Sequence, residues 1–190
     1  MVEALAHDGH VLDDDDFTNI IGRAWPHTRA YLMQRVGYDE AGVERYRVLL
    51  VEAFLARHDD ITVFPDVVEA LDALAAADVA VAVCTSSGRA HLDRVLAMPE
   101  LAGRFAVEVC REDSEAHKPD PTPYRLAAQR LGEDPAGLVA VEDTPAGVRS
   151  ALGAGMRVVA LERGLGLDVS DADVVVPTVS VAAIARAHTA

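Results

Sequence analysis

The chain has 190 residues and a mass of 20.2 kDa, which suits one domain, or a core domain with a small inserted one. Hydrophobic residues make up 51% of it and aromatic residues only 5%, so the core is expected to consist mainly of alanine, valine and leucine. The formal net charge is −14 and the pI is about 4.7. An acidic surface of this kind repels phosphate backbones, which argues against a nucleic acid partner.

The sequence shows no feature of a membrane or secreted protein. No apolar run reaches the roughly 18 residues that a membrane span needs, and the N-terminus has neither a cationic start nor an apolar signal core. The prediction is a cytoplasmic protein with no membrane partner. Cys84 and Cys110 lie within apolar runs and are interpreted as buried thiols, since a disulfide framework or thiolate metal site needs more cysteines at closer spacing.

The first third of the chain has a helical pattern. Apolar residues recur at three- and four-residue spacings over residues 11–58, and no β-rich run interrupts them. Gly37 and Gly42 are interpreted as turns between helices. Residues 1–63 are therefore predicted to form a small helical domain.

From residue 64 onward, predicted helices and strands alternate. Helices are expected at 66–77, 89–97, 122–131 and 145–154 and at the C-terminus, and strands at 79–84, 105–110, 138–141, 157–161 and 173–176. Continuous valine-rich runs are typical of parallel strands that helices cover on both faces. The fold class predicted for residues 64–190 is therefore α/β, a Rossmann-like doubly wound parallel sheet.

Ligands of such sheets bind beyond the carboxyl ends of the strands, so the residues at those ends are of interest. The first strand is followed by Thr85, Ser86, Ser87 and Gly88. A hydroxyl followed by backbone N–H groups that open a helix suits a bound phosphate. A plain helix N-cap is the alternative interpretation.

Two further strand ends carry charged groups. Lys118 stands between a loop and two prolines, which suits a fixed counter-charge to a phosphoryl group. Glu142 and Asp143 directly follow an apolar strand, and adjacent carboxylates of this kind suit a hard cation such as Mg²⁺. Alternatively, Asp143 caps the next helix and Glu142 is solvated.

Hydroxyl, lysine and acid pair occur in this order at three successive strand ends. This pattern resembles the haloacid dehalogenase superfamily, specifically its phosphatases and phosphomutases with a small helical cap. The matching stretches are residues 81–87, 118–121, 141–148 and 154–156.

The resemblance implies a role for each of these residues. Thr85 would bind the phosphoryl oxygens with help from the Ser86 amide, and Lys118 would neutralise the phosphoryl group. Glu142 and Asp143 would help to hold Mg²⁺, with Asp143 as the direct ligand.

The helices of residues 1–63 would form the cap that selects the substrate. Within them, Gly22-Arg23 resembles a loop that meets the substrate in related enzymes, and Arg23 would hold a second anionic group there. A solvated surface arginine is the alternative.

The family's nucleophile, the first aspartate of a D-x-D-x-[T/V] pattern, is missing from its expected place. Asp14 and Asp16 match the pattern literally, but no apolar strand precedes them, so we interpret them as acids on an exposed helix end. The prediction is that an N-terminal segment of about 25–30 residues lies outside this sequence. Its strand would lie between those that end at Thr85 and Glu142, and without it the chain is expected to be a poor catalyst.

The resulting hypothesis is a Mg²⁺-dependent phosphomonoester hydrolase that acts on a small phosphorylated metabolite through an aspartyl-phosphate intermediate. A phosphomutase of the β-phosphoglucomutase type shares every motif present. A dehalogenase fits less well, because cleavage of a carbon–halogen bond does not need the cation that the acid pair suits. A non-catalytic binding protein is the alternative that the missing nucleophile favours.

Overall fold

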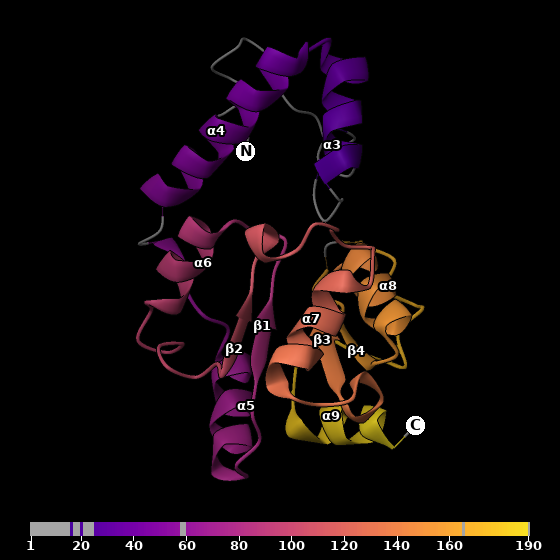
Figure 1. Cartoon of the computed structure of the whole chain (residues 1–190). Coiled ribbons are helices and arrows are strands. Elements are labelled where there is room, and N and C mark those ends of the chain that lie inside the picture. Colours follow the sequence, from indigo (N-terminus) through magenta and orange to yellow (C-terminus); the bar gives the residue numbers. More distant parts are fainter. Residues whose placement is uncertain (1–15, 17–19, 21–24, 58–59, 165, 190) are drawn as a thin grey trace. The chain divides into compact units, whose positions relative to one another are not determined.

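The computed structural model describes residues 16, 20, 25–57, 60–164 and 166–189 (Figure 1). The chain divides into two compact units, residues 1–62 and 63–190. Among the helices in these ranges, none has the length and apolar character that crossing a membrane requires.

The N-terminal unit is helical in its described part. It contains α3 (Trp25–Tyr31), the π-helical turn η1 (Leu32–Val36) and α4 (Glu40–Ala56). Gly37 ends η1 with a φ of +78°, a left-handed conformation that glycine adopts without steric cost. Gly42, which was predicted to mark a turn, lies inside α4. The reason is that Asp39 Oδ1 accepts a hydrogen bond from Gly42 N (2.8 Å), which starts the helix earlier.

Asp16 lies in the interior of this unit, with only 4% of its surface exposed. The prediction that it stands on an exposed helix end is therefore wrong. The Tyr31 hydroxyl donates a hydrogen bond to Asp16 Oδ1 (2.6 Å), and Arg35 Nε lies 3.6 Å from the same oxygen. These partners offset the desolvation of the buried carboxylate. Asp14 and Arg23 lie outside the described residues.

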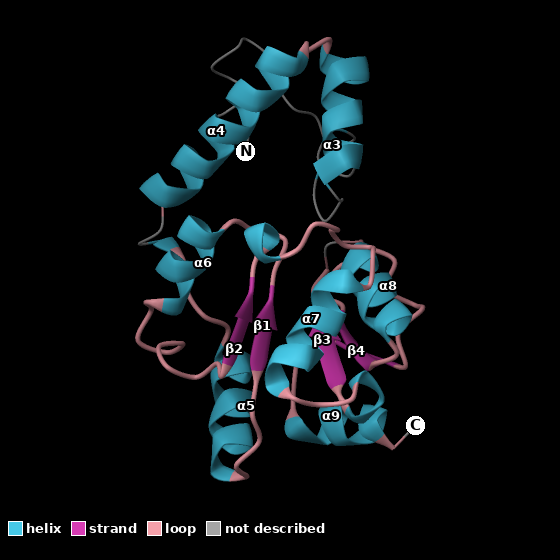
Figure 2. Cartoon of the chain, in the orientation of Figure 1, coloured by secondary structure: helices cyan, strands magenta, loops and turns pink. Residues whose placement is uncertain are grey.

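The C-terminal unit alternates helices and strands (Figure 2). Its helices are α5 (Pro65–Ala76), α6 (Arg89–Leu96), η3 (Arg111–Asp113), α7 (Thr122–Leu131), η4 (Pro135–Gly137), α8 (Pro145–Ala154) and α9 (Val181–His188). Its strands are β1 (Ala82–Cys84), β2 (Val107–Val109), β3 (Val139–Glu142), β4 (Arg157–Leu161) and β5 (Val174–Val176). The predicted α/β class is confirmed.

The five strands form two parallel sheets rather than one. β1 pairs with β2, and β3, β4 and β5 pair in that order. Among the described strands, β1 and β3 each pair along one edge only. The strand predicted at 79–84 is shortened to Ala82–Cys84, because its parallel partner β2 has only three residues in the ladder.

The larger sheet is covered on both faces, as expected of a doubly wound fold. Val158 and Ala160 of β4 pack into a core with α7 and α8, whereas Val159 packs with α9 on the opposite face. This alternation along one strand follows from the two-residue period of its side chains. Alanine and valine dominate both cores, as the composition predicts.

One buried hydroxyl in the N-terminal unit has no hydrogen-bond partner among the described residues. Tyr46 is 1% exposed and packs with Ile20, Leu32 and Val43, and its Oη forms no hydrogen bond within the described part of the chain. Burial raises the pKa of Tyr46 to about 12. The hydroxyl therefore stays protonated and loses its contacts with water without replacement.

Tyr46→Phe is expected to keep or raise the free energy of unfolding of the N-terminal unit, by up to about 1 kcal/mol, because it deletes an unsatisfied buried hydroxyl. Trp25, the only tryptophan in the sequence, packs against the same cluster, so its fluorescence during urea denaturation reports on this unit. Tyr31→Phe is the matched control. It should lower stability by about 1.5–3 kcal/mol, because it removes a hydrogen bond to the charged Asp16. Equal losses in both variants would contradict the argument.

Candidate active site

The candidate site begins at the carboxyl end of β1, where the chain turns into α6. Thr85 N donates a hydrogen bond to Val109 O (2.9 Å) and thereby extends the β1–β2 pairing. The Thr85 hydroxyl oxygen accepts a hydrogen bond from Ser87 N (3.1 Å), so this hydroxyl forms a local turn and does not cap α6, whose N-cap is Gly88. The hydroxyl proton remains available to an acceptor, and the exposed Ser86 donates no backbone hydrogen bond to another described residue.

Lys118 joins the ends of the two sheets. Its Nζ donates hydrogen bonds to Cys84 O at the end of β1 (3.0 Å) and to Glu142 Oε1 at the end of β3 (2.5 Å). The same ammonium lies 4.6 Å from the centroid of the Tyr124 ring. The Lys118 and Glu142 side chains are only 9% and 7% exposed. The lysine is therefore a fixed internal charge, as its place between a loop and two prolines predicts.

Glu142 is saturated with hydrogen bonds. Oε1 accepts from Lys118 and from the Tyr124 hydroxyl (2.6 Å), and Oε2 accepts from Asp143 N (3.2 Å) and the Thr144 hydroxyl (3.3 Å). The alternative in which Glu142 is solvated therefore does not hold. Burial, followed by the charge on Glu142, raises the pKa of Tyr124 well above its usual range, so its hydroxyl remains a donor.

Asp143 differs from its neighbour. Its carboxylate makes no hydrogen bond or ion pair with another described side chain, and it lines a pocket of about 160 Å³ together with Phe64, Leu161, Glu162, Arg163 and Leu167. The cap of α8 is Thr144, whose hydroxyl accepts from Gly147 N (3.1 Å), so Asp143 does not fill that role either. Partial desolvation, followed by the charge on Glu142, raises the pKa of Asp143.

The loop that carries Lys118 is anchored on α8. Ser150, which is fully buried, donates a hydrogen bond from its hydroxyl to Asp120 O (2.5 Å), and Arg125 donates to Gly153 O (2.9 Å). Asp120 in turn accepts from Thr122 N at the start of α7 (2.9 Å). These contacts fix the backbone between and after the two prolines, close to Lys118.

The predicted site residues Thr85, Lys118, Glu142 and Asp143 thus lie at the adjoining ends of β1 and β3. Sequence reasoning missed the partners that hold them. Tyr124 lies six residues after Lys118 at the start of α7, and Thr144 and Gly147 follow the acid pair. The proximity of Tyr124 to Lys118 in the sequence was the one available signal.

Comparison with known proteins identifies the family to which this chain belongs. The model of the haloacid dehalogenase-like hydrolases matches residues 2–155. The chain belongs to this hydrolase family. The resemblance inferred from the three motifs is thereby confirmed.

Individual relatives agree with this assignment. An uncharacterized protein of Lacticaseibacillus casei encoded in the fgs 3′ region is 33% identical over 87% of this chain and 75% of its own length. Hexitol phosphatase A of Escherichia coli is 35% identical over 66% of this chain and 57% of its own length. A crystal structure of CbbY from Rhodobacter sphaeroides in complex with phosphate superposes with a TM-score of 0.81 at 19% identity, over 97% of this chain and 89% of that one.

One glycine of this haloacid dehalogenase-like hydrolase allows the glutamate to reach its position. A Cβ on Gly147 would lie 2.0 Å from the Glu142 carboxyl carbon, closer than atoms can approach. Gly147→Ala is therefore expected to displace Glu142 and to lower the free energy of unfolding by about 1–3 kcal/mol, measured by urea denaturation followed by far-UV circular dichroism.

Gly153→Ala in the same helix is the matched control for that measurement. A Cβ there would make an ordinary 3.4 Å contact with Pro121. The substitution should keep or raise stability, by up to about 1 kcal/mol, because alanine favours helix. A similar loss of stability in both variants would show that α8 tolerates no alanine at its glycines, and that the close approach of Glu142 to Gly147 is not the cause.

Proposed function

We propose that this chain forms the phosphate- and Mg²⁺-binding body of a phosphomonoester hydrolase that acts on a small phosphorylated metabolite. The balance of charge at the strand ends supports this proposal. Lys118 and Glu142 neutralise each other as a buried pair, whereas the Asp143 carboxylate has no hydrogen bond or ion pair with a described side chain and feels the charges of Lys118 and Arg163 only at longer range. A phosphoryl dianion placed beside Thr85 would add to that negative charge, so a divalent cation is needed.

The donor chemistry fits Mg²⁺. Within the described ranges no three His, Cys, Asp or Glu side chains gather as a metal-binding group. Mg²⁺, however, is commonly held by one or two carboxylates together with water and the oxygens of a substrate phosphate. We propose Asp143 as the direct ligand. Glu142 would act through the hydrogen bond that it accepts from Asp143 N, which fixes the ligand's backbone.

The other residues would bind and orient the phosphoryl group. The Thr85 hydroxyl and the Ser86 amide are the donors in reach of a ligand at the end of β1, and the Lys118 ammonium, although paired with Glu142, would lie beside them. When bound, Mg²⁺ would withdraw charge from the phosphoryl oxygens. Arg23 remains a predicted contact to a second anionic group on the substrate.

The nucleophile is expected to come from a further strand. The open edges of β1 and β3 lie on either side of the Lys118 side chain, whose Nζ bonds to the end of each strand. We propose that a strand with an aspartate at its carboxyl end pairs with both edges and forms the aspartyl phosphate. The name of hexitol phosphatase A supports a small phosphorylated metabolite as the substrate class.

Hydrolysis of p-nitrophenyl phosphate tests the proposed activity. The chain should be compared with a form extended at the N-terminus by a strand that carries the D-x-D pattern, in Mg²⁺ and in EDTA. Only the extended form in Mg²⁺ is expected to turn over, and Asp143→Asn should lower its rate on the order of 100-fold. If the extended form is folded yet inert, the enzymatic proposal fails and a binding role replaces it.

Metal binding by Asp143 has a separate signature in stability. Mg²⁺ should raise the melting temperature of the chain, as ligands of the native state do, and Asp143→Asn should abolish this rise. Without metal, the same variant should be slightly more stable at pH 7, by less than about 1 kcal/mol, because the carboxyl remains in contact with water. Mg²⁺ stabilisation that survives in Asp143→Asn would place the metal elsewhere.

The direction of the pH dependence follows from the raised pKa of Asp143. A carboxyl whose pKa is higher in the folded state binds its proton more tightly there, so its ionisation opposes folding. The stability advantage of Asp143→Asn without metal should therefore vanish below the usual carboxyl pKa. It should grow as the pH rises through the pKa of the folded state.

A further inference from the structure

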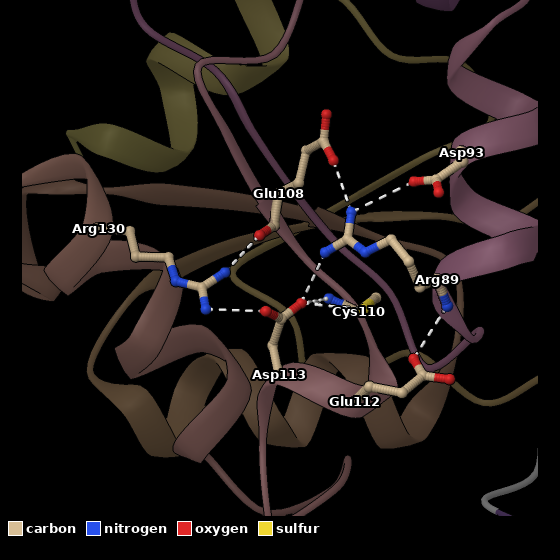
Figure 3. Close-up of polar contacts among 7 residues, drawn as sticks. All are labelled: Arg89, Asp93, Glu108, Cys110, Glu112, Asp113 and Arg130. Carbon is tan, nitrogen blue, oxygen red and sulfur yellow. Dashed lines mark hydrogen bonds and ion pairs between the residues drawn. The ribbon is translucent and has the colours of Figure 1, made fainter.

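A second polar cluster surrounds Asp113 and shares no residue with the candidate site (Figure 3). Asp113 Oδ2 accepts hydrogen bonds from Arg89 Nη2 (2.8 Å), from Cys110 N (2.8 Å) and from the Cys110 thiol (2.9 Å). Asp113 Oδ1 accepts from Arg130 Nη2 (2.8 Å). One carboxylate that is 19% exposed therefore joins α6, η3 and α7.

The two arginines of this cluster are also bonded to β2. Arg89 Nη1 donates to Glu108 Oε2 (2.7 Å), and Arg130 Nη1 donates to Glu108 O (2.6 Å). The hydrogen bonds from Cys110 and then from Arg130 hold the pKa of Asp113 well below its usual range. The Asp113 carboxylate is therefore charged at neutral pH, where it can accept hydrogen bonds from both arginines.

The cluster continues into the phosphate loop, residues 85–88. Glu112, the residue before Asp113, accepts a hydrogen bond from Arg89 N (2.9 Å) at the first turn of α6. Arg111 N donates to Ser87 O (3.0 Å) in the middle of the loop. The loop is thus fastened to residues 109–112, and Asp113 fixes the turn that contains them through the Cys110–Asp113 capping box.

We propose that Asp113 is a positioning residue for the phosphate loop. It holds η3 against Arg89, so that Glu112 and Arg111 fix the backbone that aims the Thr85 hydroxyl and the Ser86 amide. Through Arg130 the same carboxylate ties down α7, the helix that carries Tyr124 beside Lys118. The phosphate-binding part of this inference rests on the proposed function, whereas the anchoring of the loop does not.

The test compares Asp113→Asn with Asp173→Asn in two measurements. Asp173 is a matched control because it is 15% exposed and also accepts hydrogen bonds from an arginine (Arg157, 2.9 Å) and a backbone amide (Val158, 2.7 Å). It differs in its location, since its partners lie at the amino end of β4, away from the phosphate loop. Hydrogen exchange of the amides of residues 85–89 reports on the loop. Titration with inorganic phosphate measures how tightly the loop binds phosphate.

Asp113→Asn should speed exchange in the loop and raise the dissociation constant for inorganic phosphate about tenfold, since small displacements of binding groups have effects of this size. Asp173→Asn should do neither. Glu112→Ala is a milder second variant, because Glu112 is half exposed and supplies none of the hydrogen bonds that Asp113 accepts. It should shift both measurements in the same direction by a smaller factor.

Three results would overturn the inference: unchanged exchange in Asp113→Asn, faster exchange with unchanged phosphate affinity, or equal effects of the Asp173 control. Failure of the unsubstituted chain to bind phosphate would instead contradict the proposed function. In that case the exchange measurement still decides whether Asp113 anchors the loop.

Discussion

The buried ion pair between Lys118 and Glu142 is the interaction on which the rest of the candidate site depends. An isolated pair of charges in a protein interior loses more by desolvation than it gains by attraction, unless further hydrogen bonds satisfy the remaining donors and acceptors. Here Cys84 O and the Tyr124 hydroxyl supply those bonds. Removing one partner of such a pair lowers the free energy of unfolding by about 3–5 kcal/mol, because the other charge stays buried without a counter-charge. This sensitivity explains why so many neighbouring elements converge on the pair.

Because Lys118 and Glu142 neutralise each other, the two adjacent acids Glu142 and Asp143 have different roles. Glu142 is committed to the lysine and to the backbone of the acid pair, which leaves Asp143 as the carboxylate directed to a pocket. Adjacent acids in the sequence thus acquire opposite environments, one saturated and one open. Their local geometry, a strand residue followed by the residue before a helix cap, produces the difference.

The sequence was sufficient to predict the order of helices and strands in the C-terminal unit and the family, because both depend on local periodicity and on short motifs. Contacts between distant residues were not predictable in this way. Tyr124 meets Glu142 from 18 residues away, and Asp16 meets Tyr31 from 15 residues away, so neither the buried network nor the burial of Asp16 follows from spacing. Gly42 was misread because a single side-chain hydrogen bond from Asp39 decides where α4 starts. The division into two sheets depends on pairing between strands, which hydrophobic patterns do not encode.

α7 belongs to both halves of the C-terminal unit. It packs on β1 and β2 with one part of its surface and on α8 with another, while no backbone ladder connects the two described sheets. Cooperative unfolding requires that the loss of one part destabilises the next. In this unit that linkage passes through the side chains of α7 and the loop before it, and through Asp66 of α5, which accepts hydrogen bonds from Arg163 and Val179. Loosening α7 would therefore weaken the coupling between the two sheets and leave Asp66 of α5 as a remaining connection.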